Sequence, residues 1–308
     1  MSNLSNSGTI KSDGLLLLTA AIWGFAFVAQ RVGMAYVGPF TFNGVRFALG
    51  CVALLPLIIV ADKKPSSVTG HIEPVDKHAL VAGGIIAGFV LFAAASLQQV
   101  GLVYTTAGKA GFITGLYVVI VPVIGHFLKQ PSGMGTWVGA ISAAIGLYFL
   151  SMPENLMISF GDFLELLGAF LWAAHVLILG YFSPRVNSLR LAFIQFATCS
   201  LISLMTALLV EEIVIQKIMR AAIPILYGGI MSVGVAYTLQ VVSQKKAKPS
   251  HAAILLSLEA VFAVIGGWLI LNETLSARGI FGCGLMMAGM LFSQLQLYIS
   301  PNWIRGRG

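Results

Sequence analysis

The sequence predicts an all-α membrane protein whose ten transmembrane helices form two inverted five-helix repeats. Three observations lead to this fold class. The 308 residues are 58% hydrophobic and only 9% charged, with a mean hydropathy of +0.92, whereas a soluble domain is typically about 25% charged. The apolar residues form long runs between short polar breaks. The second half of the chain also repeats features of the first half in the same order.

Ten apolar runs are candidate spans, because most approach the roughly 20 residues that a helix needs to cross a bilayer. A closed β-barrel would instead show segments of about ten residues with alternating polarity, and these runs are continuously apolar. The fifth run is the shortest, so we expect it to depend on tilt or local thinning of the bilayer. In chain order the runs are 14–34, 40–61, 79–100, 105–128, 134–151, 162–182, 190–210, 221–243, 250–272 and 277–298.

The distribution of Lys and Arg sets the expected orientation. With the N-terminus in the cytoplasm, 12 of the 18 basic residues fall inside, 5 fall outside and Arg46 lies within a span. We therefore expect a multi-pass protein of the inner (cytoplasmic) membrane with both termini in the cytoplasm. The expected domains are an N-terminal tail (1–13), two five-helix repeats (14–151 and 161–298) and a basic C-terminal tail (299–308).

Matching residues recur in the two halves in the same order. Because each half would contain five spans, an odd number, the second half enters the membrane from the opposite side. Inverted repeats around a midplane site are the architecture of many secondary transporters. The matched sets are Trp23 with Trp172, Gln98 with Gln240, and Gly125, Gly139 and Gly146 with Gly266, Gly282 and Gly289.

Several long segments have a recognisable pattern. The first half contains AAIWGFAFVAQRVGMAYVGPFTFNGVRFALG and YTTAGKAGFITGLYVVIVPVIGHFL, and the second contains AKPSHAAILLSLEAVFAVIGGWLILNETLSARGIFGCGLMMAGMLF. These segments resemble the EamA-type family of the drug/metabolite transporter superfamily. The resemblance covers 15–151 and 161–297. It implies ten helices and a central cavity lined mainly by helices one, three, four, six, eight and nine. Many relatives carry proline where this chain has Ala260, so we expect a straighter ninth helix. The first repeat lacks the second repeat's Asn-Glu pair, so no mirrored acid can be assigned.

One carboxylate, Glu259, lies well inside the ninth span, where a charge costs free energy. Helical spacing places it on one face with Leu255, Phe262 and Gly266. If this face lines the cavity, Glu259 is a substrate-binding residue and a proton-coupling candidate, because burial disfavours the charged form of a carboxyl group. The alternative is an acid that only packs against neighbouring helices. Glu273 ends the same run, and a structural, loop-anchoring role is favoured for it.

Aromatic and polar residues share faces on helices one and six. Trp23, Phe27 and Gln30 lie on one face of the first helix, and Trp172 and His175 lie on one face of the sixth. Aromatic side chains with a few polar groups suit a pocket for an amphipathic organic solute. A histidine side chain titrates in the physiological range. The alternatives are that Trp23 only packs and that His175 is neutral and bonded to one neighbour.

Amide side chains occupy matched places on helices three and eight. Tyr237, Gln240 and Gln244 share a face of helix eight, and either Gln98 or Gln99 takes the corresponding place on helix three. Buried amides are unlikely to face lipid. We include Gln98, Tyr237 and Gln240 among the expected substrate-binding residues, with helix–helix hydrogen bonding as the alternative.

Two basic residues, Arg46 and Lys109, lie in or beside spans. Arg46 either snorkels outward or pairs with an acid, and a structural role is favoured for it. Snorkelling is favoured for Lys109, with attraction of anions as the alternative. The chain has no phosphate-binding GxxxxGK[ST] loop and no HExxH or clustered Cys/His set. We expect no cofactor and no metal.

Taken together, the sequence predicts a secondary transporter, not an enzyme, that moves a small organic solute such as an amino acid or related metabolite outward by alternating access. Proton coupling through Glu259 is a separate hypothesis. The alternatives are an obligate antiporter of phosphorylated or nucleotide-linked substrates, which needs paired cations in the cavity, and a membrane-embedded enzyme. The expected partners are the solute and membrane lipid. Nucleic acid is rejected because the cations form no folded basic face, and a homodimer is left open.

Overall fold

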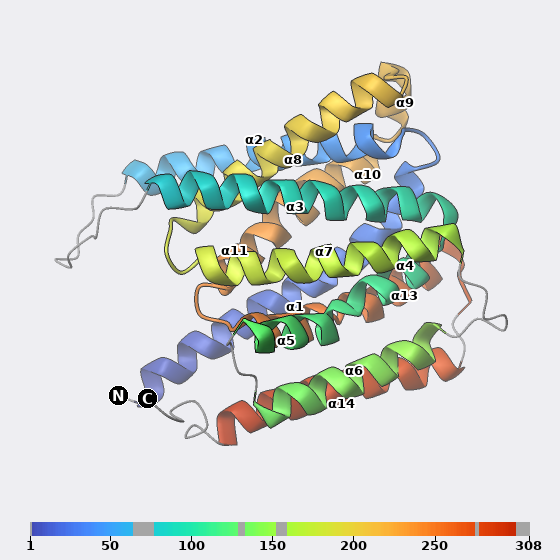
Figure 1. Cartoon of the computed structure of the whole chain (residues 1–308). Helices are drawn as coiled ribbons and strands as arrows, with labels where there is room; N and C mark the ends of the chain where they lie inside the picture. The colour runs from blue at the N-terminus through green and yellow to red at the C-terminus, as the bar shows by residue number, and fades with distance from the viewer. Residues whose placement is uncertain (1, 64–76, 129–132, 152–158, 275–276, 300–308) are drawn as a thin grey trace.

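A computed structural model describes residues 2–63, 77–128, 133–151, 159–274 and 277–299. This part of the chain is helical and contains no strand (Figure 1). The elements are α1 (Ser2–Gly33), α2 (Pro39–Lys63), α3 (Lys77–Tyr104), α4 (Ala107–Gly115), α5 (Tyr117–Phe127), α6 (Met134–Ser151), α7 (Phe160–Phe182), α8 (Ser188–Val210), α9 (Ile215–Arg220), α10 (Ala222–Leu226), the π-helical segment η1 (Tyr227–Tyr237), α11 (Thr238–Ser243), α12 (Pro249–Leu256), α13 (Glu259–Leu271) and α14 (Ala277–Ile299).

The prediction of an all-helical membrane protein is confirmed. Within the described residues, eight helices are long and apolar enough to cross a membrane, some of them built from consecutive shorter segments. The two remaining predicted spans correspond to α6 and α14, whose described apolar windows, Met134–Gly146 and Ile280–Gly289, are shorter. Ten membrane crossings and the inverted repeat therefore stay predictions. The predicted C-terminal tail lies beyond the described residues except for Ile299, and α1 begins before the predicted first span.

Helices that are distant in the sequence pack side by side. The most extensive contacts are those of α6 with α14, α3 with α7, α2 with α8, α3 with α8 and α1 with α13. In Figure 1, the α6–α14 pair forms one edge of the molecule and α2, α3 and α8 form the opposite edge. Helices α1, α7 and the broken pairs α4–α5 and α12–α13 lie between these edges. The interior of the molecule is therefore built from both halves of the chain.

The ninth predicted helix is interrupted by a short turn at Ser257 and Leu258, and the expectation that Ala260 leaves it straighter than in relatives with proline stays a prediction. Helix α12 ends at Leu256 and α13 begins at Glu259. Between them the backbone tightens into three-residue turns, with Ala260 N donating to Ser257 O at 3.2 Å and Val261 N to Leu258 O at 3.0 Å. The break therefore needs no proline, because tighter 3₁₀-type bonds satisfy the local backbone groups.

The fourth predicted helix is broken in the same way. Helices α4 and α5 meet at Leu116, whose N–H donates to Ile113 O at 3.1 Å, and Val119 N donates to Leu116 O at 3.0 Å. Leu116 and Ser257 are separated by the same number of residues as Gly125 and Gly266, a pair matched in the predicted repeat. The two breaks thus occupy corresponding positions in the two halves.

Two carboxylates hold helix starts across the fold. The oxygens of Glu273 accept hydrogen bonds from Ala107 N at 3.3 Å and Gly108 N at 3.4 Å, at the start of α4. Glu211 accepts from Phe40 N and Thr41 N, both at 2.8 Å, at the start of α2. The first N–H groups of a helix have no partner within the helix, and negative charge is favoured there. This geometry agrees with the structural role expected for Glu273.

Candidate functional site

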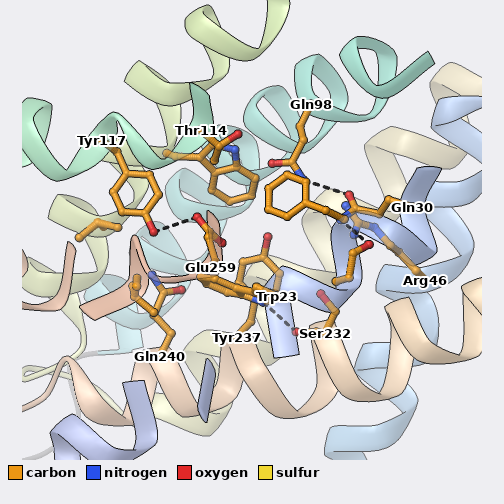
Figure 2. Close-up of a pocket in the computed structure, with 15 residues that line it drawn as sticks. Trp23, Gln30, Arg46, Gln98, Thr114, Tyr117, Ser232, Tyr237, Gln240 and Glu259 are labelled. Carbon is orange, nitrogen blue, oxygen red and sulfur yellow. Dashed lines mark hydrogen bonds between the residues drawn. The ribbon is translucent and has the colours of Figure 1, made fainter. Parts of the chain in front are cut away.

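A narrow pocket lies at the centre of the helix bundle, where the broken helices meet α1 and α7 (Figure 2). Its cavity of about 30 Å³ has room for about two water molecules. Eight of the nine residues expected to bind substrate line it, so the structure brings these eight side chains together. The lining residues are Trp23, Ala26, Phe27, Gln30, Arg46, Gln98, Thr114, Tyr117, Trp172, Val176, Ser232, Tyr237, Gln240, Leu256 and Glu259.

Glu259 is the acidic residue of the pocket lining. It is the first residue of α13, immediately after the break, and its side chain is buried. The Tyr117 hydroxyl, from the first residue of α5, donates to its Oε1 at 2.9 Å (Figure 2). The two helix breaks therefore deliver a hydrogen-bonded acid–phenol pair to the pocket.

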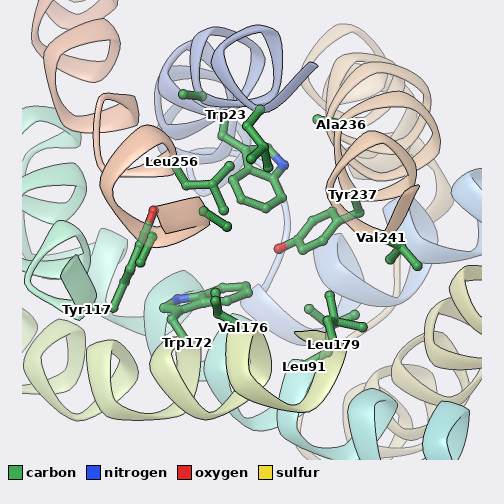
Figure 3. Close-up of a cluster of buried hydrophobic side chains, with 14 of the residues drawn as sticks. Trp23, Leu91, Tyr117, Trp172, Val176, Leu179, Ala236, Tyr237, Val241 and Leu256 are labelled. Atoms are coloured by element: carbon green, nitrogen blue, oxygen red, sulfur yellow. The ribbon is translucent and has the colours of Figure 1, made fainter. Parts of the chain in front are cut away.

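Aromatic side chains form one wall of the pocket. Figure 3 shows Tyr237 between Trp23 and Trp172, with ring centroids 4.5 Å and 6.2 Å away. The Trp23 indole N–H donates to Ser232 O at 3.3 Å. These rings offer a rigid apolar surface with polar edges, as ligand pockets do.

Two buried polar atoms of the lining have no hydrogen-bond partner among the described residues. They are Nε1 of Trp172, an obligatory donor, and Oε1 of Gln240, an acceptor. A buried polar group without a partner costs free energy. These atoms are thus suited to bind polar groups of an incoming solute.

The other amides of the pocket are engaged with each other. Gln98 Nε2 donates to Gln30 Oε1 at 3.0 Å, and Gln30 Nε2 donates to Ala26 O at 3.1 Å. Gln99 does not line the pocket and donates to Gln30 O at 3.3 Å. The choice of Gln98 over Gln99 as the pocket residue agrees with this geometry. Gln244 donates to Val176 O at 3.0 Å, a helix–helix bond.

His175 is the one expected binding residue that the structure places outside the lining. Its side chain is fully buried, and Nε2 lies 2.9 Å from Gln195 Oε1. The imidazole packs edge-on against Trp172 and Tyr237, with centroids 6.0 Å and 6.3 Å away. This arrangement matches the alternative of a histidine bonded to one neighbour, behind the aromatic wall.

Sequence reasoning gave no pocket role to several polar residues in the lining or next to it, among them Tyr117, Arg46 and Glu165. It gave Tyr117 no role, and it favoured a structural or snorkelling position for Arg46, which is 1% exposed and lines the pocket. It also passed over Glu165, a fully buried acid whose Oε2 accepts from the Thr114 hydroxyl at 3.1 Å. The signal available for Arg46 and Glu165 was a charged residue inside an apolar run, which marks a functional candidate by default.

The described residues contain no group of three or more His, Cys, Asp or Glu side chains placed to hold a metal ion. The pocket lining combines aromatic, amide, acidic and basic side chains.

Known proteins resemble this chain along nearly its whole length. Residues 10–152 and 159–295 match the model of the EamA-like transporter family. An uncharacterized transporter of Archaeoglobus fulgidus is 31% identical over 284 residues, covering 92% of this chain and 85% of that protein. The uncharacterized transporter YoaV of Bacillus subtilis is 25% identical over 297 residues, covering 91% of this chain and 97% of that protein. A solved crystal structure aligns with a TM-score of 0.73 at 18% identity, over 92% of this chain and 97% of that one, which is a likeness of fold.

Proposed function

The chain belongs to the EamA-like transporter family and is a membrane transporter of small solutes, and from this premise we propose that it is a secondary active transporter. Its solutes are small organic molecules, such as an amino acid or related metabolite. It moves them outward across the cytoplasmic membrane by alternating access.

The observation that carries this proposal is the central pocket itself. It combines an aromatic wall with an acid, a guanidinium and amides, and two of its polar atoms lack partners among the described residues. Such a set fits an amphipathic organic solute better than a bare ion or a lipid tail. The lining comes from both predicted repeats, so movement of one repeat against the other changes access to the site.

The small cavity and the broken helices support the proposal of alternating access. A space of about 30 Å³ does not hold an amino acid, so the helices around it must separate for a solute to enter. Broken helices at corresponding positions of two repeats are typical of transporters whose site lies at the repeat interface. We propose that the two five-helix units rock about the pocket and open it to one side of the membrane at a time.

Proton coupling through Glu259 is a separate part of the proposal. The carboxyl group lines the pocket and accepts a hydrogen bond from the Tyr117 hydroxyl. A change in its charge therefore alters both the hydrogen bonds and the electrostatic field that a bound solute meets. A proton bound there on one side and released on the other couples transport to the proton gradient.

The antiporter of phosphorylated substrates is a weaker candidate. Of the two cations that could have formed its anion site, Lys109 lies outside the pocket lining, with its Nζ 3.7 Å from Asp162 Oδ2. A single remaining guanidinium does not supply the paired cations that a phosphoryl group requires. If the protein were instead a membrane-embedded enzyme, products would form without movement of the solute. Proteoliposomes that contain the purified protein can measure both.

Counterflow in proteoliposomes tests the proposed function. Vesicles containing the purified protein are loaded with an unlabelled amino acid mixture and diluted into trace labelled amino acids. We expect transient accumulation of label that protein-free vesicles do not show. Trp172→Phe removes the unpartnered indole N–H of the pocket, whereas Trp268→Phe makes the same change at a side chain that is 52% exposed on the outer surface. We expect a loss of counterflow for Trp172→Phe alone. Absence of counterflow with the wild-type protein across the mixture would refute the proposed substrates.

A further inference from the structure

Arg46 is a buried cation that has no acidic partner among the described residues. It lies in α2, is 1% exposed and lines the central pocket. No ion pair joins it to an acid among the described residues, and its terminal NH₂ groups make no hydrogen bond to them; its Nε donates to Asn43 Oδ1 at 3.0 Å. A charge held at this depth without a counter-ion costs free energy. The terminal NH₂ groups of this cation are therefore available to bind an anion in the pocket.

The neighbours of Arg46 fix its side chain in place. Asn43, which accepts the Nε hydrogen bond, donates its own amide to Ala95 O at 3.0 Å. The guanidinium carbon lies 5.6 Å and 5.0 Å from the ring centroids of Phe42 and Phe47, within cation–π range. An ordered guanidinium loses less conformational freedom when it binds an anion than a mobile one does. These contacts preorganise the terminal NH₂ groups.

The two charges of the pocket lie at different ends of it. Figure 2 shows Arg46 beside Gln30 at one end and Glu259 with Tyr117 at the other. Within the described lining, Arg46 is the one Lys or Arg and Glu259 the one Asp or Glu. A solute lying along the pocket therefore meets a guanidinium at one end and a carboxyl group at the other.

We propose that Arg46 is the anion anchor of the pocket and binds the carboxylate of the transported solute. A guanidinium matches a carboxylate with two parallel N–H···O bonds, and one such fork balances one negative charge. A phosphate dianion bound to the same guanidinium would leave one negative charge uncompensated, in a pocket that also contains the Glu259 carboxyl group. The proposal rests on the proposed function and narrows it, because it makes a carboxylate a requirement and excludes amines and amides as equal substrates.

The test compares each acid with its amide in counterflow through intact protein. The probes are L-alanine, L-leucine and L-phenylalanine, each paired with the amide that replaces its carboxylate. We expect the wild type to favour the acid of at least one pair by about 10- to 100-fold, the range for hydrogen bonds to a charged group. Arg46→Gln is expected to abolish this preference, and Arg46→Lys to retain part of it. Arg278→Gln removes the same charge from an exposed position in α14 and is expected to leave the preference unchanged.

The acid-to-amide ratio reports recognition separately from folding. Arg46→Lys keeps the charge, so it supplies a readout if the neutral variant does not yield monodisperse protein. Equal transport of acids and amides by the wild type would overturn the inference and leave the transport function standing. An unchanged ratio in Arg46→Gln or Arg46→Lys would also overturn it. Counterflow of none of the six probes by the wild type would overturn the inference together with the proposed amino acid substrates.

Discussion

The contact between α1 and α13 beside the pocket gives a steric prediction that the structure makes quantitative. A Cβ atom added at Gly24 would lie 2.2 Å from Phe262 Cβ, 2.7 Å from Glu259 O and 2.8 Å from Ala263 N. Two of these atoms belong to the backbone at the start of α13, so no side-chain rotation relieves the overlap. The same helix supplies a control, because a Cβ at Gly14 meets nothing within 4 Å.

Both substitutions to alanine share the gain in helix propensity, about 1 kcal/mol at most. Overpacking of a tight contact costs about 1–3 kcal/mol, and only Gly24→Ala pays it. We therefore expect Gly14→Ala to be neutral or slightly stabilising and Gly24→Ala to be less stable than Gly14→Ala by about 1–3 kcal/mol.

Thermal unfolding of the two variants in the same detergent measures this difference. We expect the apparent melting temperature of Gly24→Ala to lie several degrees below that of Gly14→Ala, and its counterflow to fall because α13 carries Glu259 into the pocket. Gly24→Ala melting at or above Gly14→Ala would refute the close packing of α1 against α13.

Three further predictions concern the charged residues and the chain ends. Glu259→Gln is expected to abolish uptake driven by a pH gradient while leaving counterflow intact, and an unchanged pH dependence of vesicle uptake would remove the proton-coupling hypothesis. Glu211→Ala removes the acceptor at the start of α2 and is expected to lower the free energy of unfolding by about 1–2 kcal/mol, whereas Glu212→Ala, at a side chain 84% exposed, should melt like the wild type. In a variant lacking the 3 natural cysteines, single cysteines in the tails 1–13 and 299–308 are expected to react with impermeant reagents only from the cytoplasmic side, and labelling from opposite sides would exclude the inverted repeat.

The membrane fold and most of the pocket were predictable because both follow from local periodicity. The length and continuity of the apolar runs identify helices, and i, i+4 and i+7 spacing places Trp23, Phe27 and Gln30 on one face. The matched residues of the other half then select the faces that turn toward the same centre. The repeat spacing also relates the positions of the two breaks at Leu116 and Ser257.

The remaining features depend on contacts between helices that periodicity does not specify. His175 shares a face with Trp172, but His175 does not line the pocket. Its Nε2 lies 2.9 Å from Oε1 of Gln195, which belongs to the neighbouring helix α8. Arg46 has a long side chain, and the sequence does not show whether it reaches a membrane surface or an interior pocket. Tyr117 gains its role only because α5 approaches the start of α13, a contact between the two halves.

That contact also connects solute binding to the motion we propose. The hydrogen bond from Tyr117 to Glu259 joins α5 of the first half to α13 of the second at 2.9 Å. If the halves separate, the bond is lost, and a buried carboxyl group without a donor costs free energy. A solute whose hydrogen-bond donor lies next to Glu259 can replace the Tyr117 hydroxyl. A proton on Glu259 removes the negative charge, and with it the need for a donor. Either event lowers the free-energy cost of separating the halves. The Tyr117–Glu259 hydrogen bond therefore stabilises the closed, empty pocket, and binding of a solute or a proton at Glu259 favours the opening of the pocket.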